Sequence, residues 1–278
     1  MHIKCHAKIN IGLAVKGRRA DGFHDIESLF ATVSLSDELE IEPAESYSLE
    51  SDDCSLDCSE ANLVTKAALA LSARTGKRVG ARAFLKKSIP EKAGLGGGSS
   101  DCAAALLGFN KILGLNLGRE ELKSLAAGLG SDVPFFLEGG FAMCRGRGEE
   151  VSRLDSRLLD AFECVLVMPG FPISTKEAYA SLGAGARKEP DFASFLSALA
   201  SRECEGLQGM LFNDFEPFAY SRCPELADIK TALLGSGALY ASLSGTGSAV
   251  YGLYRRGEGE KAARIFAGIR TACCLFVA

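Results

Sequence analysis

The chain has 278 residues, in which 31 lysines and arginines stand against 35 aspartates and glutamates, for a formal net charge of −4. Apolar residues make up 47% and charged residues 24%, which is typical of a globular protein with one large domain or two ordinary ones. The charge balance argues against a nucleic acid or an anionic membrane held by bulk charge, and no apolar run approaches the length of a membrane span.

The cysteines and the first residues indicate a reducing compartment. Ten cysteines include no CxxC pair, and residues 1–6 lack the apolar region of a signal peptide. We therefore expect a cytoplasmic protein. A metal site formed by His2, Cys5 and His6 is the alternative interpretation of that segment, but no second ligand cluster with zinc spacing accompanies it.

The N-terminal segment, residues 3–15, alternates apolar residues with polar or small ones. This period predicts a β-strand with one buried face. Lys8 and Asn10 lie on the other face. Two interpretations stand for that face: a solvated strand edge, or the wall of a cleft with a cation beside an amide.

The rest of the first half predicts strands joined by short turns, with helices between them. Asn62 is placed to cap one helix and Gly76 to close it. In chain order we expect a turn-rich loop over 17–24, strands at 28–36 and 38–42 joined by a turn at Ser36 and Asp37, an irregular stretch over 43–61 with a short strand near 47–49, a helix at 63–73, a strand at 81–87, helices at 102–113 and 119–129, a short helix opened by 130–136, and strands at 139–145 and 149–154.

A polar stretch at 155–160 predicts a boundary between two domains, 1–155 and 156–278. Because strands pair through short turns and helices are segregated, the fold class predicted is α+β. For the second half we expect a buried strand at 164–168, a helix over 174–182, a linker at 183–190, helices at 192–200, 212–220 and 224–234, a strand at 238–243, a glycine loop at 244–248, a strand at 249–254, a helix at 258–269 and a strand at 272–277.

A glycine-rich stretch, residues 90–101, precedes a segment rich in alanine and leucine. These residues favour a helix, and serine or aspartate caps a helix start, so we expect a glycine loop that runs into a helix N-terminus. Such a loop lets a phosphate approach unpaired main-chain amides. It is not a Walker A loop, because Ser99 follows Gly98 where lysine is required, and it lacks the third glycine of a Rossmann fingerprint.

Three further polar groups accompany this loop: Lys8 with Asn10, Ser131 with Asp132, and the glycine loop at 244–248. Phosphoryl transfer would use them together. The loop amides would hold nucleotide phosphates, Asp132 would accept the proton of the attacking hydroxyl, and Lys8 would neutralise charge on the transferring group. Taken alone, Asp132 is typical of a helix cap and Lys8 of a solvated charge, so the hypothesis depends on the joint pattern.

Residues 7–10, 90–100 and 243–248 resemble the three signature motifs of the GHMP small-molecule kinases. Within that superfamily, residues 19–24 and 130–136 resemble the members that phosphorylate the 2-hydroxyl of a cytidine-diphosphate sugar alcohol in the non-mevalonate isoprenoid pathway. The resemblance covers residues 5 to about 254. It implies an ATP-dependent kinase with a two-domain GHMP fold, whose active site lies in the cleft between the domains.

The resemblance also implies roles by position. Lys8 and Asp132 would be the catalytic pair, and Mg²⁺ is expected with ATP, with Ser100 as a candidate ligand. The acceptor would be bound by Asn10, Phe23, His24, Asp132 and Thr175, of which Phe23 and His24 would hold the cytosine. The ATP phosphate loop would consist of Pro90, Glu91, Lys92, Ala93, Gly94, Leu95, Gly96, Gly97, Gly98, Ser99 and Ser100.

The chain departs from the family pattern at His6, where proline is usual, and at Phe23, where tyrosine is usual. Phenylalanine keeps the stacking face but loses the hydroxyl. In the phosphate loop, Glu91, Lys92 and Ala93 replace smaller residues, and a carboxylate at Glu91 would be unfavourable near phosphate unless it points away.

Two other functions remain as alternatives. The first is a kinase of the same fold with another acceptor, such as homoserine, mevalonate or a sugar, and Phe23 with His24 is the discriminating feature. The second is a nucleotide-binding regulator without catalysis, which predicts that the lysine or the aspartate is missing, whereas Lys8 and Asp132 are both present.

Overall fold

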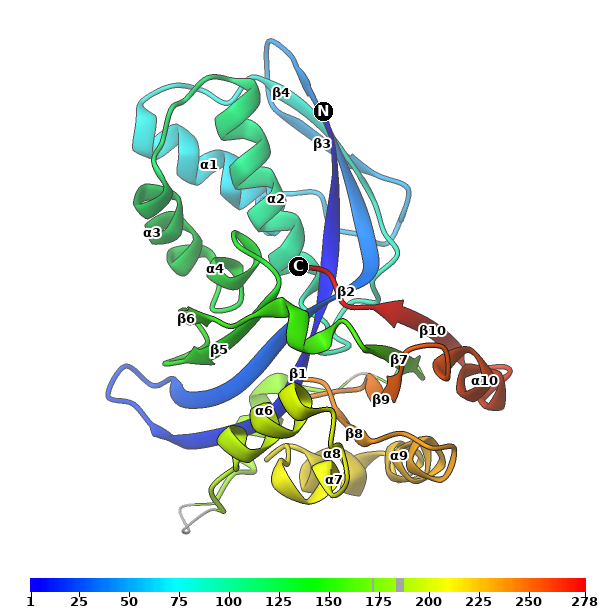
Figure 1. The fold of residues 1–278 in the computed structure, drawn as a ribbon. Helices are drawn as coiled ribbons and strands as arrows, with labels where there is room; N and C mark the ends of the chain where they lie inside the picture. Colours follow the sequence, from blue (N-terminus) through cyan, green and yellow to red (C-terminus); the bar gives the residue numbers. More distant parts are fainter. Residues whose placement is uncertain (172, 184–187) are drawn as a thin grey trace.

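Two β-sheets form the frame of the molecule, and the computed structural model describes residues 1–171, 173–183 and 188–278 (Figure 1). The first sheet has the strand order β3-β4-β2-β5-β6, with β1 paired to β2, and the second has the order β10-β7-β9-β8. Every pairing is antiparallel except β3 with β4. The strands are β1 (His2–Arg18), β2 (His24–Pro43), β3 (Ser48–Ser51), β4 (Ala81–Lys86), β5 (Phe141–Arg145), β6 (Glu150–Arg153), β7 (Phe162–Met168), β8 (Tyr240–Leu243), β9 (Val250–Arg255) and β10 (Arg270–Leu275).

The helices gather in two groups, one beside each sheet, which confirms the predicted α+β class (Figure 1). Beside the first sheet lie α1 (Leu63–Thr75), α2 (Gly97–Ile112), α3 (Arg119–Leu129) and α4 (Val133–Phe136). With the second half of the chain come α5 (Thr175–Ala180), α6 (Phe192–Ser201), α7 (Leu207–Met210), α8 (Glu216–Arg222), α9 (Glu225–Gly235) and α10 (Gly259–Ala263), and two 3₁₀ turns at Ser156–Leu159 and Arg264–Phe266.

Strands β1 and β2 form a long hairpin that joins the two layers. The alternation in residues 3–15 predicted one buried face, but positions 7–15 of β1 are buried on both faces. Ala7, Ile9 and Ile11 pack in a core cluster that also contains side chains of β7 and β9. The opposite face carries Lys8 and Asn10, which are only 4% and 1% exposed, so the solvated edge is the wrong interpretation.

The predicted turn at Ser36 and Asp37 is wrong, because β2 continues through both residues as one strand. The pairing with β1 shifts register between His6 and Ala7, which is a β-bulge rather than a chain reversal. The Asp37 carboxylate explains the error: it accepts hydrogen bonds from the main chain beyond β4, and a short polar side chain in that role looks like a turn residue in sequence.

The helices of the first half follow their end signals with one exception. Asn62 caps α1 through its side chain, and Gly76 ends that helix with φ of +69°. The exception is α2, which begins at Gly97 and not at residue 102. Gly96 adopts φ of +70° before the helix, so the last glycines and the serines form its first turn.

The second half differs from expectation at three helices. Residues 212–215 precede α8, because the Leu13 amide donates to the Phe212 carbonyl and the Asp214 amide donates to the Leu13 carbonyl. The helix expected at 258–269 is α10 followed by a 3₁₀ turn, and the short α7 was not predicted. The predicted linker at 183–190 lies partly outside the described residues.

The two sheets share apolar packing, since one core cluster contains side chains from β1 and β2 together with side chains from β7 and β9. The first sheet ends at Arg153 and the second starts at Phe162; the division into domains 1–155 and 156–278 stays a prediction. No helix among the described residues has both the length and the apolar character that crossing a membrane requires.

Candidate active site

The glycine loop between β4 and α2 is held between the two halves of the chain. The Lys8 amide of β1 donates to the Leu95 carbonyl at 2.9 Å. From the second half, the Ser244 hydroxyl donates to the Gly94 carbonyl at 2.8 Å, and the Ala249 amide donates to the Ala93 carbonyl at 3.0 Å. The loop main chain is therefore fixed before any ligand binds, which lowers the cost of ordering it around a phosphate.

Gly94 is required by this close approach. Its φ is +78°, and a Cβ atom at this position would lie 2.0 Å from the Ser244 carbonyl oxygen. The second glycine loop, 244–248, therefore packs directly against the main chain of the first and fixes its position. Its sequence signal was clear, but its partner across the chain could be identified only from the structure.

Two cavities meet at this loop. The larger, of about 960 Å³, lies between the two halves and is lined by Lys8, Asn10, Phe23, His24, Asp132 and Thr175, so the structure brings together all the residues predicted for catalysis and acceptor binding. The smaller, of about 490 Å³, lies on the α1 side. It is lined by Pro90, Glu91, Lys92, Ala93, Gly94, Leu95, Gly96, Gly97, Gly98 and Ser99 of the predicted phosphate loop.

The loop forms a shared wall between the cavities, since Lys92, Gly94, Gly96 and Ser99 line both. Ser100 lines neither cavity and is buried at 4% exposure, which counts against it as a metal ligand. Glu91 is exposed, and it lines the smaller cavity but not the larger one.

Lys8 and Asp132 face each other at the junction of the cavities. The Lys8 Nζ atom lies 3.4 Å from Asp132 Oδ2, and the side chains are 5% and 28% exposed. A Cβ atom placed on Gly96 would lie 3.2 Å from Lys8 Cε, so the ammonium stem runs directly under the glycine loop. The Lys8 Nζ atom also lies 4.5 Å from the centre of the Phe30 ring, a cation–π contact that holds the stem.

Asp132 precedes α4 but makes no side-chain capping bond, so the simple cap interpretation is wrong. Its carboxylate is directed to the lysine instead. A Cβ atom on Gly148 would lie 3.5 Å from Asp132 Oδ1, which shows that the turn between β5 and β6 also borders this carboxylate.

Asn10 holds Lys8 in position from the same strand face. Its Oδ1 atom accepts a hydrogen bond from Lys8 Nζ at 2.5 Å, and its Nδ2 group donates to the Ser28 hydroxyl at 3.0 Å. The Asn10 carbonyl accepts from the Tyr251 hydroxyl of β9 at 2.7 Å. Its amide group is therefore fixed by the protein, and it orients the ammonium group.

The rings of Phe23, His24 and Tyr179 border one part of the larger cavity, its aromatic end. Phe23 is 51% exposed, and the Arg147 guanidinium lies 4.9 Å from its ring centre. The loop that carries Phe23 is tied by its own Asp21, whose Oδ1 atom accepts from the Phe23 amide at 3.1 Å. The His24 ring stacks on Tyr179 of α5 at 4.9 Å, with an interplanar angle of 28°.

Arg147 and Tyr179 are cavity residues that sequence reasoning missed. Burial, together with the negative charge of Asp132, raises the pKa of Tyr179 to about 12, so its hydroxyl stays neutral. The turn of glycines around Arg147 was visible in the sequence, but no pattern connected either residue to the aromatic pair at 23 and 24.

Thr175, the first residue of α5, completes the wall from the second half. Its hydroxyl lies 3.2 Å from that of Thr246 in the second glycine loop. Within the part of the chain that the structure describes, the charged side chains that line the larger cavity are one carboxylate, Asp132, and five cations, Lys8, Arg18, Lys92, Arg147 and Lys176. A cavity this basic, in a chain of net charge −4, attracts an anionic ligand.

Among the described residues, no group of three or more histidine, cysteine, aspartate or glutamate side chains is placed to hold a metal ion. His2 and Cys5 lie on opposite faces of β1, because side chains alternate along a strand. All ten cysteines are free thiols.

Comparisons with known proteins agree with this geometry. Residues 62–140 match the GHMP kinases N terminal domain, and residues 195–268 match the GHMP kinases C terminal domain. The 4-diphosphocytidyl-2-C-methyl-D-erythritol kinase of Prosthecochloris aestuarii is 40% identical over 94% of this chain and 92% of its own. The enzyme of that name from Carboxydothermus hydrogenoformans is 42% identical over 91% of this chain and 88% of its own.

Solved structures extend the likeness to the whole chain. A crystal structure of 4-(cytidine 5'-diphospho)-2C-methyl-D-erythritol kinase superposes with a TM-score of 0.85 at 33% identity, and covers 100% of both chains. A homoserine kinase from Cytophaga hutchinsonii has a TM-score of 0.75 at 20% identity and covers 98% of this chain and 94% of its own. At that identity the likeness concerns the fold alone.

Proposed function

The chain belongs to the GHMP kinase family, and from that premise we propose that it transfers the γ-phosphoryl group of ATP to the 2-hydroxyl of 4-diphosphocytidyl-2-C-methyl-D-erythritol. This reaction is a step of non-mevalonate isoprenoid precursor biosynthesis. The observation that carries the proposal is the junction of two cavities at the facing Lys8 and Asp132, with a glycine-rich main chain as the shared wall.

ATP occupies the smaller cavity, with its phosphates along residues 90–99. The base end lies beside Asn62 and Leu63 at the start of α1, which line the same cavity. Because Gly94, Gly96 and Ser99 border both cavities, the terminal phosphate is the part of ATP that reaches the larger one. The amides at the start of α2 and the loop main chain stabilise its negative charge.

The acceptor occupies the larger cavity. Its cytosine base stacks against Phe23 and lies close to the His24–Tyr179 pair, and its diphosphate lies within the field of Arg18, Lys92 and Lys176. Its 2-hydroxyl then reaches Asp132, which lines the same cavity. The hydroxyl of Thr175 lines the same cavity and can hydrogen-bond to polar groups of the acceptor.

Asp132 orients the acceptor hydroxyl and takes up its proton as the bond to phosphorus forms. The Lys8 ammonium neutralises the charge that builds on the transferring phosphoryl group, and Asn10 keeps that ammonium in place. The two substrates meet at one point in a fixed orientation, and positioning and electrostatics supply nearly all of the catalysis in such a reaction.

The residues present fit a magnesium ion that would be held mainly by the phosphates of ATP and by water. Magnesium takes one or two protein oxygens in such sites. Ser99, which borders both cavities, is the hydroxyl placed to serve, in preference to the enclosed Ser100. When bound, the ion neutralises phosphate charge and aligns the phosphates.

A panel of acceptors tests the proposal. We incubate the purified protein with Mg-ATP and 4-diphosphocytidyl-2-C-methyl-D-erythritol, homoserine, mevalonate or a sugar, and measure ADP release. The cytidine compound alone should sustain turnover. Turnover with homoserine or mevalonate in its place would contradict the proposed acceptor, and loss of all turnover with intact ATP binding would favour a regulator.

The free thiols support a cytoplasmic location, because a reducing compartment keeps cysteines unpaired. We propose small-molecule partners, ATP and the cytidine-diphosphate sugar alcohol, and no nucleic acid or membrane.

A further inference from the structure

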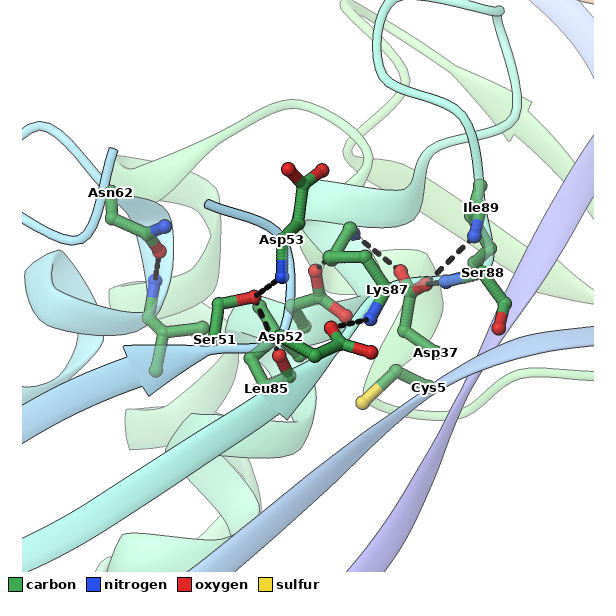
Figure 2. Close-up of polar contacts among 12 residues, drawn as sticks. Cys5, Asp37, Ser51, Asp52, Asp53, Asn62, Leu85, Lys87, Ser88 and Ile89 are labelled. Atoms are coloured by element: carbon green, nitrogen blue, oxygen red, sulfur yellow. Dashed lines mark hydrogen bonds and ion pairs between the residues drawn. The ribbon is translucent and has the colours of Figure 1, made fainter. Parts of the chain in front are cut away.

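Three charged side chains form a buried cluster beneath the phosphate loop, at a distance from the Lys8–Asp132 pair. Lys87 Nζ lies 2.5 Å from Asp37 Oδ2 and 2.8 Å from Asp101 Oδ2. The side chains of Lys87, Asp37 and Asp101 are 8%, 0% and 3% exposed. Figure 2 shows the ammonium of Lys87 directed to the carboxylates around it.

The cluster ties together the two ends of the phosphate loop. Lys87 immediately follows β4, and Asp101 is the fifth residue of α2, so they stand before and after the loop. Asp37, on β2, accepts hydrogen bonds from the amides of Ser88 at 2.5 Å and Ile89 at 2.7 Å (Figure 2). Both loop ends are therefore anchored to a strand of the first sheet.

Lys87 also reaches the opposite wall of the smaller cavity through its main chain. Its amide donates to Asp52 Oδ1 at 2.9 Å, and the neighbouring Ser51 hydroxyl donates to the Leu85 carbonyl at 2.6 Å (Figure 2). The segment after Asp52 continues to residues 55–57, which line the cavity together with Lys87 and Asp101. One residue thus joins the base side and the phosphate side of the proposed ATP site.

Two carboxylates share one ammonium here, away from water. Burial raises the pKa of Asp101 to about 7, against the opposing effect of Lys87. The groups that face Asp101 are Cys5 of β1, Asp37 of β2 and Lys87 after β4. From α1, Lys66 acts on the neighbouring Cys102. Apolar side chains of similar size often stabilise a fold as well as a buried ion cluster does, so stability alone does not explain these charges. Because the cluster lies next to the smaller cavity, a role in ligand binding does.

We propose that Asp37, Lys87 and Asp101 are positioning residues for ATP, which set the spacing of the phosphate loop against the base-side wall. None of them touches the reacting atoms. The inference rests on the proposed function in one respect, that the loop at residues 90–99 binds nucleotide phosphates. It goes beyond that function because it assigns nucleotide affinity to groups behind the loop.

The first test replaces Lys87, which pairs with both carboxylates. Lys87→Met keeps the length of the side chain and removes its charge, and Lys86→Met is the matched control, since Lys86 is exposed and pairs loosely with Glu38 at 3.8 Å. We measure the Kd of Mg-ADP by calorimetry, and the KM of ATP, the KM of the acceptor and kcat. A misplaced loop should raise the Kd and the KM of ATP by at least about tenfold, while the acceptor KM changes by less than about twofold.

The control should match the wild type in all four quantities. An unchanged Kd for Mg-ADP in folded Lys87→Met protein would overturn the proposal, as would an equal rise in both KM values. A wild-type protein that binds no Mg-ADP would overturn this inference and the proposed function together. Normal Mg-ADP binding without turnover of the cytidine compound would count against the acceptor assignment alone.

The second test keeps the inference falsifiable if Lys87→Met does not fold. Asp101→Asn preserves shape and resembles the protonated acid. Between about pH 6 and pH 8, the ratio of ATP KM in the variant to that in the wild type should rise, because the wild-type cluster becomes fully ion-paired as Asp101 loses its proton. The ratio cancels the titration of ATP itself. A ratio that stays constant over this range would overturn the proposal.

Discussion

The phosphate loop is fixed by main-chain hydrogen bonds from both halves of the chain and by buried charges behind it, whereas the aromatic end of the larger cavity is built on exposed elements. Phe23 is 51% exposed on a loop, and Tyr179 belongs to a helix of 6 residues. The phosphate loop, which any phosphoryl transfer from ATP requires, is thus held in place by several independent sets of contacts. The aromatic end of the larger cavity, which selects the acceptor, can change in sequence without disturbing the two sheets.

The largest effect is expected at the junction of the two regions. Asp132→Asn keeps the shape of the side chain but removes the acceptor for the hydroxyl proton, so kcat should fall by at least about 10²-fold. Both KM values and the thermal midpoint should stay close to the wild type. Steady-state kinetics with saturating Mg-ATP provide the measurement, and near-normal kcat would remove Asp132 from its proposed role.

Two glycine substitutions compare the regions directly. Gly94→Ala places a Cβ atom 2.0 Å from a carbonyl oxygen at φ of +78°, whereas Gly22→Ala, in the acceptor loop at φ of +88°, meets nothing within 4 Å. Gly94→Ala should lower kcat/KM for ATP by at least about tenfold and destabilise the fold by about 1–3 kcal/mol.

Gly22→Ala should cost no more than about 1–2 kcal/mol, the strain of a left-handed residue. Urea unfolding and ATP kinetics on both variants give the comparison. Equal effects at the two positions would contradict the view that the phosphate loop is the rigid region.

Phe23 tests the acceptor end. Base–aromatic stacking is worth about 1–3 kcal/mol, so Phe23→Ala should raise the acceptor KM by roughly 5- to 150-fold and leave the ATP KM unchanged. Phe23→Tyr, which restores the residue usual in the family, should stay within about threefold because the stacking face is kept. A rise in the ATP KM for Phe23→Ala would place the ring in the wrong cavity.

The buried cluster predicts a distinctive pH dependence of stability. Burial raises the pKa of Asp101 from the 3.8 usual for an aspartate to about 7, so between these values the native state binds a proton that the unfolded state does not. The contribution of Asp101 to stability is therefore greatest below the unfolded pKa and is lost as pH rises through about 7.

Relative to the wild type, Asp101→Asn should gain stability from about pH 4 to pH 8, by on the order of 1 kcal/mol or more. Guanidinium unfolding of both proteins across this range measures the difference. A difference that does not change with pH would show that Asp101 titrates normally.

The smallest effect is expected for the charge pairs that Glu27 of β2 makes with Lys16 of β1 and Arg145 of β5. Glu27 pairs with Lys16 and Arg145 near the surface, and its pKa is lowered by these cations although partial burial opposes them. A lowered pKa gives stability above the unfolded value that is lost as pH falls through the folded one. Glu27→Gln should cost less than about 1 kcal/mol near neutral pH, since exposed pairs are screened by water. A larger loss on urea unfolding would mean that these pairs contribute as much to stability as buried ones do.

Much of the local structure followed from the sequence. Asn62 and Gly76 mark the ends of α1, and the strand after the polar stretch at 155–160 is buried as its apolar run predicts. Errors arose where a residue's partner is remote. Asp37 looked like a turn former because its partners, Ser88 and Ile89, lie some fifty positions further on.

By itself, the sequence predicted the α+β class and the glycine loop, and it singled out Lys8, Asp132, Phe23 and His24 as candidate site residues. Periodicity, caps and motifs are local properties, so the sequence alone reveals them. The tertiary structure decided what those residues face. It buried both sides of β1, brought Lys8 to 3.4 Å from Asp132, added Arg147 and Tyr179 to the aromatic end, and closed the Lys87 cluster behind the loop. Such contacts join segments far apart in the chain, and they depend on how the two sheets pack, which no local pattern encodes.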